Sequence, residues 1–251
     1  MVLDPSTSTI YVFGGRAITP DPHTTIYSGL YTYHIPSNRW QLIRSDSTSG
    51  DGVPLKGRIG HSMVIDDERR ELLVLAGQRS KDYLSDFYAI LLETFHVREL
   101  SRDYTKEGGP DAGFTQRAVV DTSRGELYLL SGLMRERGSA QETVRNSFWV
   151  YNLRKGGWKR VYVDHGDAST SKDKNEPVPR FAHQMVGGGG NIFKNSPHHH
   201  HVHPHHPHHA HHQNYAPSKW GGKFWLFGGN PGVSGEPELR LDDFWQLELS
   251  R

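Results

Sequence analysis

The densest cluster of side chains that could bind a metal is a histidine tract. Eleven of the chain's 17 histidines lie between His198 and His212, where prolines interrupt them, and a glycine run at 187–190 precedes them. Neutral imidazoles bind Zn, Cu or Ni, so the tract could bind such ions, although loosely, because a flexible tract lacks the fixed surroundings of a dedicated site. Proline and glycine prevent regular structure, and we favour an inert, disordered surface loop over residues 187–219. The metal-binding alternative rests on His198, His199, His200, His201, His203, His205, His206, His208, His209, His211 and His212.

Two further histidines recur at one position of a repeated motif. His61 ends Arg58-Ile59-Gly60-His61, and His183 ends Arg180-Phe181-Ala182-His183. A side chain that recurs from copy to copy more often bonds a neighbouring strand or turn than acts in catalysis. Gln116 occupies the position in a third copy and could make the same hydrogen bond without titrating. We therefore interpret both histidines as structural.

Four aspartates also stand at recurring positions. Asp66 and Asp121 each close an apolar run, and Asp86 and Asp243 each precede another. Aspartate is favoured in turns because its carboxylate bonds the local backbone. We interpret all four as turn residues.

The composition excludes several function classes. The chain has 251 residues and no cysteine, which excludes a disulfide scaffold, a Cys-ligated zinc site and a thiol nucleophile. No serine elbow, phosphate-binding loop or His-Glu-x-x-His motif occurs. With 29 Lys and Arg against 28 Asp and Glu, the chain lacks the basic footprint of a nucleic-acid binder. We expect a non-enzyme without a cofactor.

Hydropathy and the start of the chain bear on location. No apolar run approaches the roughly 18 residues that cross a bilayer, and the sequence from Met1 reads as folded protein rather than as a signal peptide. We expect a soluble protein of the cytoplasm, the nucleus or both, with no membrane partner.

These residues must be positioned by short apolar runs that recur along the chain. Four runs end in glycine, at 10–15, 71–77, 126–132 and 223–229, and each is followed by an aromatic run. Trp40 and Trp158 open a further segment ten residues after Leu30 and Phe148, and Val97 fills that position in the second copy. Four strands per unit, repeating every 55 to 62 residues where no insertion intervenes, predict the four-stranded antiparallel blades of an all-β propeller.

The Gly-Gly after the second strand, the aromatic third strand and the spaced tryptophan are marks of kelch repeats. Several segments further resemble the muskelin family of kelch-repeat proteins: 58–61, 77–87, 113–118, 144–149, 179–184, 227–232 and 240–245. The resemblance implies a six-blade kelch propeller in a subunit of a CTLH-type ubiquitin ligase, without an active site. The implied partners are ligase subunits or substrates. Oligomerisation is expected to depend on parts that this chain lacks.

The repeats divide the chain into four expected blades. These are 1–57, lacking most of its first strand, 58–113, 114–179, and 180–251, which carries the His-rich insertion and no fourth strand. We accordingly expect a fragment of a longer ring with both end blades incomplete.

Function in a propeller is expected in the loops that the rigid blades present. The long polar loops between second and third strands cover 16–28, 78–85, 133–146 and 230–242. Their arginines could pair bidentately with a partner's carboxylates, or could instead brace adjacent blades. Tyr83 and Leu133 are candidate apolar anchors. The candidate partner-binding residues are Arg16, Arg79, Tyr83, Leu133, Arg135 and Asn230.

Overall fold

The computed structural model describes residues 1–21, 23–46, 53–130, 132–135, 142–163, 177–188, 223–233, 236 and 238–248. All regular structure within these ranges is β-strand, and every strand pairing is antiparallel. No helix among the described residues has the length and apolar character that crossing a bilayer requires.

The fold contains four main sheets, and in each of them the strands lie side by side in the order in which they follow along the chain. The first has the order β1 (Val2–Asp4), β2 (Thr9–Phe13), β5 (Leu30–His34), β6 (Arg39–Arg44). The second contains β7 (Ser62–Asp66), β8 (Glu71–Leu75), β11 (Phe87–Leu91) and β12 (Val97–Ser101). The third contains β14 (Arg117–Asp121), β15 (Glu126–Leu130), β18 (Ser147–Asn152) and β19 (Trp158–Val163). The fourth contains β20 (Gln184–Gly188), β21 (Lys223–Phe227) and β22 (Phe244–Glu248). The loop expected over 187–219 was wrong at its start, because Gly187 and Gly188 pair with Phe224 and Lys223 of β21.

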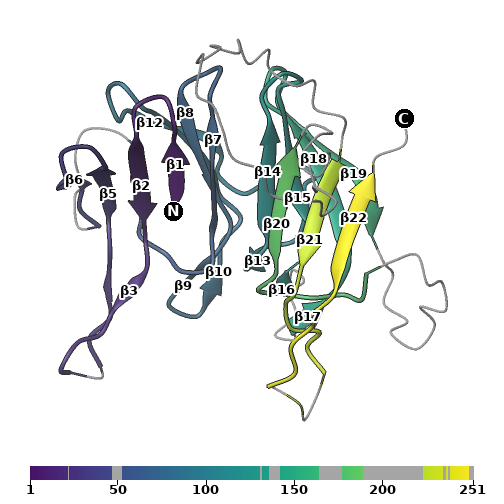
Figure 1. Cartoon of the computed structure of the whole chain (residues 1–251). Coiled ribbons are helices and arrows are strands. Elements are labelled where there is room, and N and C mark those ends of the chain that lie inside the picture. The colour runs from purple at the N-terminus through teal and green to yellow at the C-terminus, as the bar shows by residue number, and fades with distance from the viewer. Residues whose placement is uncertain are drawn as a thin grey trace, which may run out of the picture.

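The sheets stand side by side in chain order (Figure 1). Their first strands are neighbours, because β7 packs beside β1, β14 beside β7, and β20 beside β14. The predicted all-β propeller built from four-stranded antiparallel blades is confirmed.

Apolar side chains fill the space between successive sheets. Successive side chains of a strand point to opposite faces of the sheet. Leu72 of β8 therefore packs in the cluster shared with the first sheet, and Leu73 packs in the cluster shared with the third. Every residue of β8 is buried, which explains why its sequence reads as an apolar run. A third cluster joins Tyr128 and Phe148 of the third sheet to Phe224 of the fourth.

The recurring tryptophan position behaves differently in each sheet. Trp158 packs between the second and third sheets, with its ring 5.4 Å from that of Tyr104 and 5.0 Å from that of Tyr151. Val97 is buried between the first and second sheets. Trp40 is 62% exposed and contacts Tyr33 of its own sheet. The position thus contributes to the packing between sheets through Trp158 and Val97, whereas Trp40 is largely exposed on the first sheet.

The two edges of the sheets differ. In three sheets, the segment that connects the second and third strands forms a β-hairpin of its own. The hairpins are β3 (Arg16–Ala17) with β4 (Ile26–Tyr27), β9 (Gln78–Arg79) with β10 (Asp82–Tyr83), and β16 (Leu133–Arg135) with β17 (Glu142–Val144). A short strand, β13 (Gly113–Phe114), pairs with β16. We call the edge from which these hairpins project the hairpin edge; it lies at the bottom of Figure 1.

Tight turns form the opposite edge, the turn edge. The Asp66 carboxylate accepts hydrogen bonds from the backbone of Glu68 and Arg69, both at 3.2 Å, and Asp121 accepts one from Arg124. The interpretation of Asp66 and Asp121 as turn residues is confirmed.

The glycine that follows the second strand meets different surroundings in successive sheets. Gly77 has a φ of 95°, and a Cβ there would lie 2.7 Å from the Ile59 carbonyl oxygen and 2.9 Å from the His61 Cβ. Gly15, its counterpart in the first sheet, has a φ of 97° and open space around it.

We therefore expect Gly77→Ala to lower the free energy of unfolding by about 2–4 kcal/mol, through backbone strain together with overpacking. Gly15→Ala should cost only the strain, about 1–2 kcal/mol. Urea unfolding of the two variants measures the difference. Equal losses would show that the crowding at Gly77 does not matter.

Candidate functional site: the hairpin edge

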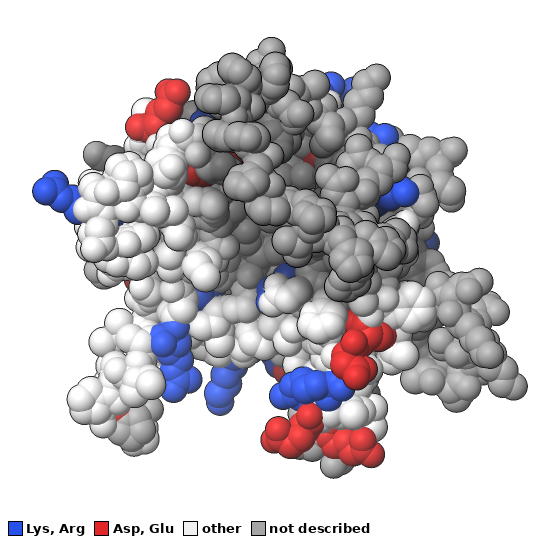
Figure 2. Space-filling view, in the orientation of Figure 1, with Lys and Arg blue, Asp and Glu red and all other residues white. Residues whose placement is uncertain are grey.

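The hairpin edge presents charged and apolar side chains together. Figure 2 shows Lys and Arg side chains along it, below the sheets, and a group of Asp and Glu beside them. Ile18, just beyond β3, is 101% exposed, and Val233 and Leu239 between β21 and β22 are also exposed. Arginine is enriched at protein interfaces, and these apolar side chains offer contact area at the same edge.

Arg79 of β9 is held by the first sheet. Its guanidinium forms a bidentate pair with Asp46, at 2.8 and 2.9 Å, and also donates to the Gly57 carbonyl oxygen. It lies 4.3 Å from the centre of the Tyr27 ring. Of the two alternatives for the loop arginines, pairing with a partner or bracing adjacent blades, these contacts agree with bracing for Arg79.

Tyr83 and Arg135 connect the second hairpin to the third. The Tyr83 hydroxyl donates to the Glu142 carboxylate at 2.8 Å, and Arg135 donates to the same oxygen at 2.9 Å. Arg135 also lies 4.7 Å from the centre of the Tyr83 ring. Burial raises the pKa of Tyr83, and the Glu142 carboxylate raises it further, so the phenol stays protonated. The ring additionally stacks on Phe114.

Leu133 and Asn230 are parts of the scaffold. Leu133 pairs with Phe114 and Val144 in the sheet of the third hairpin. Asn230 is 6% exposed, exchanges both backbone hydrogen bonds with Phe181, and accepts one from the Gly232 amide at 2.6 Å.

Arg16 of β3 is the candidate that stays available. It is exposed, and its side chain has no hydrogen bond or ion pair with the described residues. Partner binding by the six predicted residues remains a prediction. Among their arginines, Arg16 has the most accessible guanidinium.

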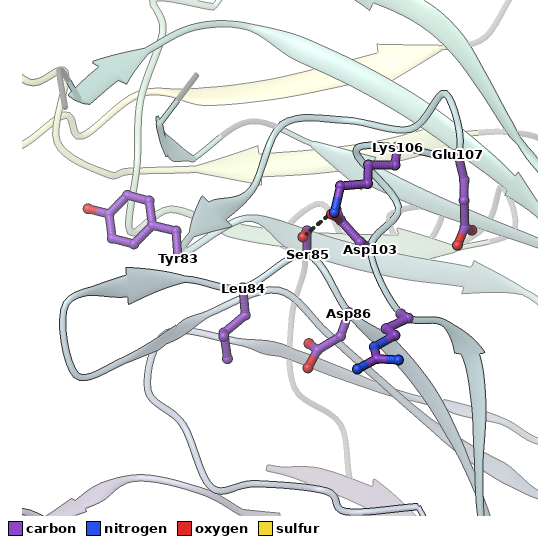
Figure 3. A pocket seen from close by; sticks show the side chains of 8 residues that line it. Tyr83, Leu84, Ser85, Asp86, Asp103, Lys106 and Glu107 are labelled. Atoms are coloured by element: carbon purple, nitrogen blue, oxygen red, sulfur yellow. Dashed lines mark hydrogen bonds and ion pairs between the residues drawn. The ribbon is translucent and has the colours of Figure 1, made fainter. Parts of the chain in front are cut away.

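The sequence interpretation missed a hollow at this edge, which Figure 3 shows at close range. It has a volume of about 470 Å³ and lies between residues 83–86, before β11, and Arg102, Asp103, Lys106 and Glu107, after β12. Ser85 donates to Asp103 at 2.8 Å, and Lys106 forms an ion pair with the same carboxylate. Burial alone would raise the pKa of Asp103, but the hydrogen bonds from Lys106, Thr105 and Ser85 outweigh it and lower the pKa.

A second cleft of about 490 Å³ adjoins this hollow. Both share Leu84, Asp86 and Arg102, and the cleft extends toward Val53 and Pro54 of the first sheet's outgoing loop. The predicted strand order could have indicated both hollows. In an antiparallel meander, the segments that follow the second and the fourth strand lie at the same edge of the sheet.

A buried ion pair forms the floor of the cleft. Arg58 is 1% exposed and forms a bidentate pair with Asp86, one of whose contacts is 3.0 Å long. Arg58 also donates to the carbonyl oxygens of Lys56 and Ala76. Arg180 repeats this arrangement with Asp243 in the fourth sheet.

The interpretation of Asp86 and Asp243 as turn residues did not anticipate this pair. Their carboxylates meet a buried guanidinium from the segment before the first strand of the same sheet, and Asp243 in addition accepts a hydrogen bond from its own backbone amide. In the third sheet Gly113 and Ser147 take the two positions, so both members of the pair are absent together.

His61 and His183 lie inside the structure. His183 is 0% exposed, and neither ring nitrogen meets a hydrogen-bond partner among the described residues. His61 packs edge-on against Phe13, with its Nδ1 similarly unpaired. Burial, helped by arginine charges, lowers the pKa of each to about 3. The histidines are structural and pack as neutral rings. His61 also forms the expected hydrogen bond, with the backbone of Arg58, whereas His183 has none at its ring nitrogens among the described residues.

Gln116 does form such bonds. It donates to the Asp111 carbonyl oxygen at 3.3 Å and accepts a longer one, 3.5 Å, from the buried Tyr104 hydroxyl. The prediction for the third copy is confirmed.

The histidine tract 198–212 lies outside the described residues, and its binding of metal remains a prediction. Within the described ranges, no three His, Asp or Glu side chains gather as a metal site would require.

A family model, the KLHDC2/KLHL20/DRC7 Kelch-repeats domain, matches residues 1–203. The chain is also 21% identical over 253 residues to Mei4-dependent protein 6 of Schizosaccharomyces pombe. That match covers 99% of this chain and 31% of the relative, so the chain spans about a third of the relative's length. These matches identify kelch repeats and do not single out the muskelin family.

Proposed function

The chain belongs to the kelch-repeat family of the KLHDC2/KLHL20/DRC7 type, and from this membership we propose that it is a non-catalytic module that binds other proteins through its hairpin edge. Rigid sheets that present loops at one edge suit recognition, because the scaffold holds the contact residues in place.

The observation that carries the proposal is the exposure of unlike side chains at this edge. Arg16 is free of described partners, and Ile18 two residues later is fully exposed. Arginine is enriched at protein interfaces, and an aliphatic side chain on the same short hairpin adds apolar contact area beside it.

The buried polar groups support a non-catalytic role. Arg58 and Arg180 are engaged by Asp86 and Asp243, and His183 is enclosed by protein. A general acid or base must reach the proton that it transfers, which an enclosed side chain does not do.

The finer proposal comes from the resemblance to the muskelin family. We propose that the module recruits or positions substrates or subunits for a CTLH-type ubiquitin ligase, in the cytoplasm, the nucleus or both. The repeat segments at 77–87 and 227–232, on which that resemblance rests, border the hairpin edge.

Affinity capture of the full-length protein from its own cells, read by quantitative mass spectrometry, tests both levels. We expect RING-type and CTLH-motif subunits in near-stoichiometric amounts. Recovery of other proteins alone would reject the ligase role and keep the interaction module. Recovery of nothing above a mock capture would reject both.

A further inference from the structure

We propose that the cleft between the first and second sheets binds an extended peptide segment that carries an apolar side chain next to an acidic one. This inference rests on the proposed function, whose partner it describes by chemical class.

The shape of the cleft fits an extended segment. One wall is the loop after β6, with Val53, Pro54 and Lys56, and the other is built from Leu84 and Tyr88 of the second sheet. The cleft of about 490 Å³ continues past Arg102 into the hollow of about 470 Å³ shown in Figure 3. Two joined hollows along one edge suit a chain that rises about 3.3 Å per residue.

The floor of the cleft is already organised. Arg58 is held by Asp86 and two carbonyl oxygens, and its guanidinium lies 5.6 Å from the centre of the Tyr88 ring. Arg79 at the side is fixed by Asp46. A site whose polar groups are fixed in advance loses little affinity to ordering when the ligand binds.

The walls and the charges together select the ligand. Val53, Pro54 and Leu84 offer an apolar surface for one aliphatic or aromatic side chain. Lys56 and Arg102 are exposed and have no hydrogen bond or ion pair with the described residues. Lys56 lies within reach of the Asp46 charge, and Arg58 and Arg79 are already paired, so Arg102 is the cation of the cleft most available to meet a carboxylate.

Carboxylates without an ion pair among the described residues argue against a polyanion. Glu99 lines the cleft and Glu107 lines the adjoining hollow, whereas Asp86 is neutralised by Arg58. A nucleic acid would bring phosphates against these carboxylates, and like charges that meet across an interface suppress binding. A peptide with one or two carboxylates directed at Arg102 avoids that repulsion.

Selection of a random octapeptide display library on the full chain tests the inference. We expect enrichment of Asp or Glu next to Leu, Ile or Phe. Arg102→Glu should reverse the acidic preference toward Lys or Arg and weaken the best acidic peptide by about tenfold or more. Arg39→Glu, at an exposed arginine of β6 outside the cleft, should leave the selection unchanged.

A second substitution gives the opposite sign. Glu99→Gln should strengthen binding of the same acidic peptide severalfold, because it removes a repulsive charge. Absence of a motif, or a motif that Arg102→Glu does not alter, overturns the inference. Cellular partners captured by the full-length protein would still support the interaction module in that case, so the two failures are distinguishable.

Discussion

Replacing Asp86 with alanine should lower the free energy of unfolding by about 3–5 kcal/mol, because it leaves a charge buried without its partner. Arg58 is 1% exposed, and its two remaining acceptors, the carbonyl oxygens of Lys56 and Ala76, are neutral. Water that enters from the cleft in place of the carboxylate supplies no opposite charge to the guanidinium. Urea unfolding at neutral pH measures the loss.

Two further variants separate the ion pair from general damage to the cleft. Asp82→Ala removes an exposed carboxylate from nearby β10 and should change stability by no more than about 0.5 kcal/mol. Arg58→Met combined with Asp86→Ala should recover part of the loss, since no unpaired charge remains. The third sheet, with Gly113 and Ser147, shows that a sheet of this fold forms without the pair. An Asp86→Ala loss as small as that of Asp82→Ala would refute the buried-charge explanation.

Mild acid should destabilise the protein through its two enclosed histidines. His61 and His183 have a pKa of about 3 in the folded chain against an ordinary value of 6.5. Below pH 6.5 these two histidines therefore bind protons in the unfolded chain but stay neutral in the folded chain. Stability is full above pH 6.5 and falls as the pH drops toward 3. At pH 5.5 each histidine should cost about 1.4 kcal/mol, hence about 3 kcal/mol for the pair.

The control for this pH dependence is present in the repeat itself. Gln116 fills the equivalent position of the third copy, so His61→Gln combined with His183→Gln should flatten the stability profile between pH 7.5 and 5.5. The aspartates with a lowered pKa do not interfere. Their contribution is present above 3.8, the ordinary value, and is lost only as the pH falls below it. An unchanged slope in the double variant would show that other groups cause the acid sensitivity.

The strands were predictable because they bury both faces. The apolar run that ends at Gly77 packs against two neighbouring sheets at once, so its hydropathy alone indicates a strand between blades. The recurrence of that run in four copies then predicted the propeller. The hairpins β9–β10 and β16–β17 were described only as loops, since two-residue and three-residue strands of mixed polarity give no such pattern.

The contacts of the candidate site were harder to predict. Arg79 and Arg135 could equally have pointed to solvent, and what decides is a carboxylate from another segment: Asp46 for Arg79, Glu142 for Arg135. The buried Arg58–Asp86 pair, by contrast, did leave a signal. Both members occur in the second and fourth copies, and both are missing from the third.

The central claim, that partners bind at the hairpin edge, is tested most directly by capturing cellular partners with two matched variants. Arg16→Ser with Ile18→Ser alters exposed residues of the first sheet's hairpin, and Arg39→Ser with Ile35→Ser makes the same changes at its turn edge. We expect the hairpin variant to lose most of its partners while the turn variant retains them. Loss of partners from the turn variant alone would place binding on the opposite edge and contradict the account.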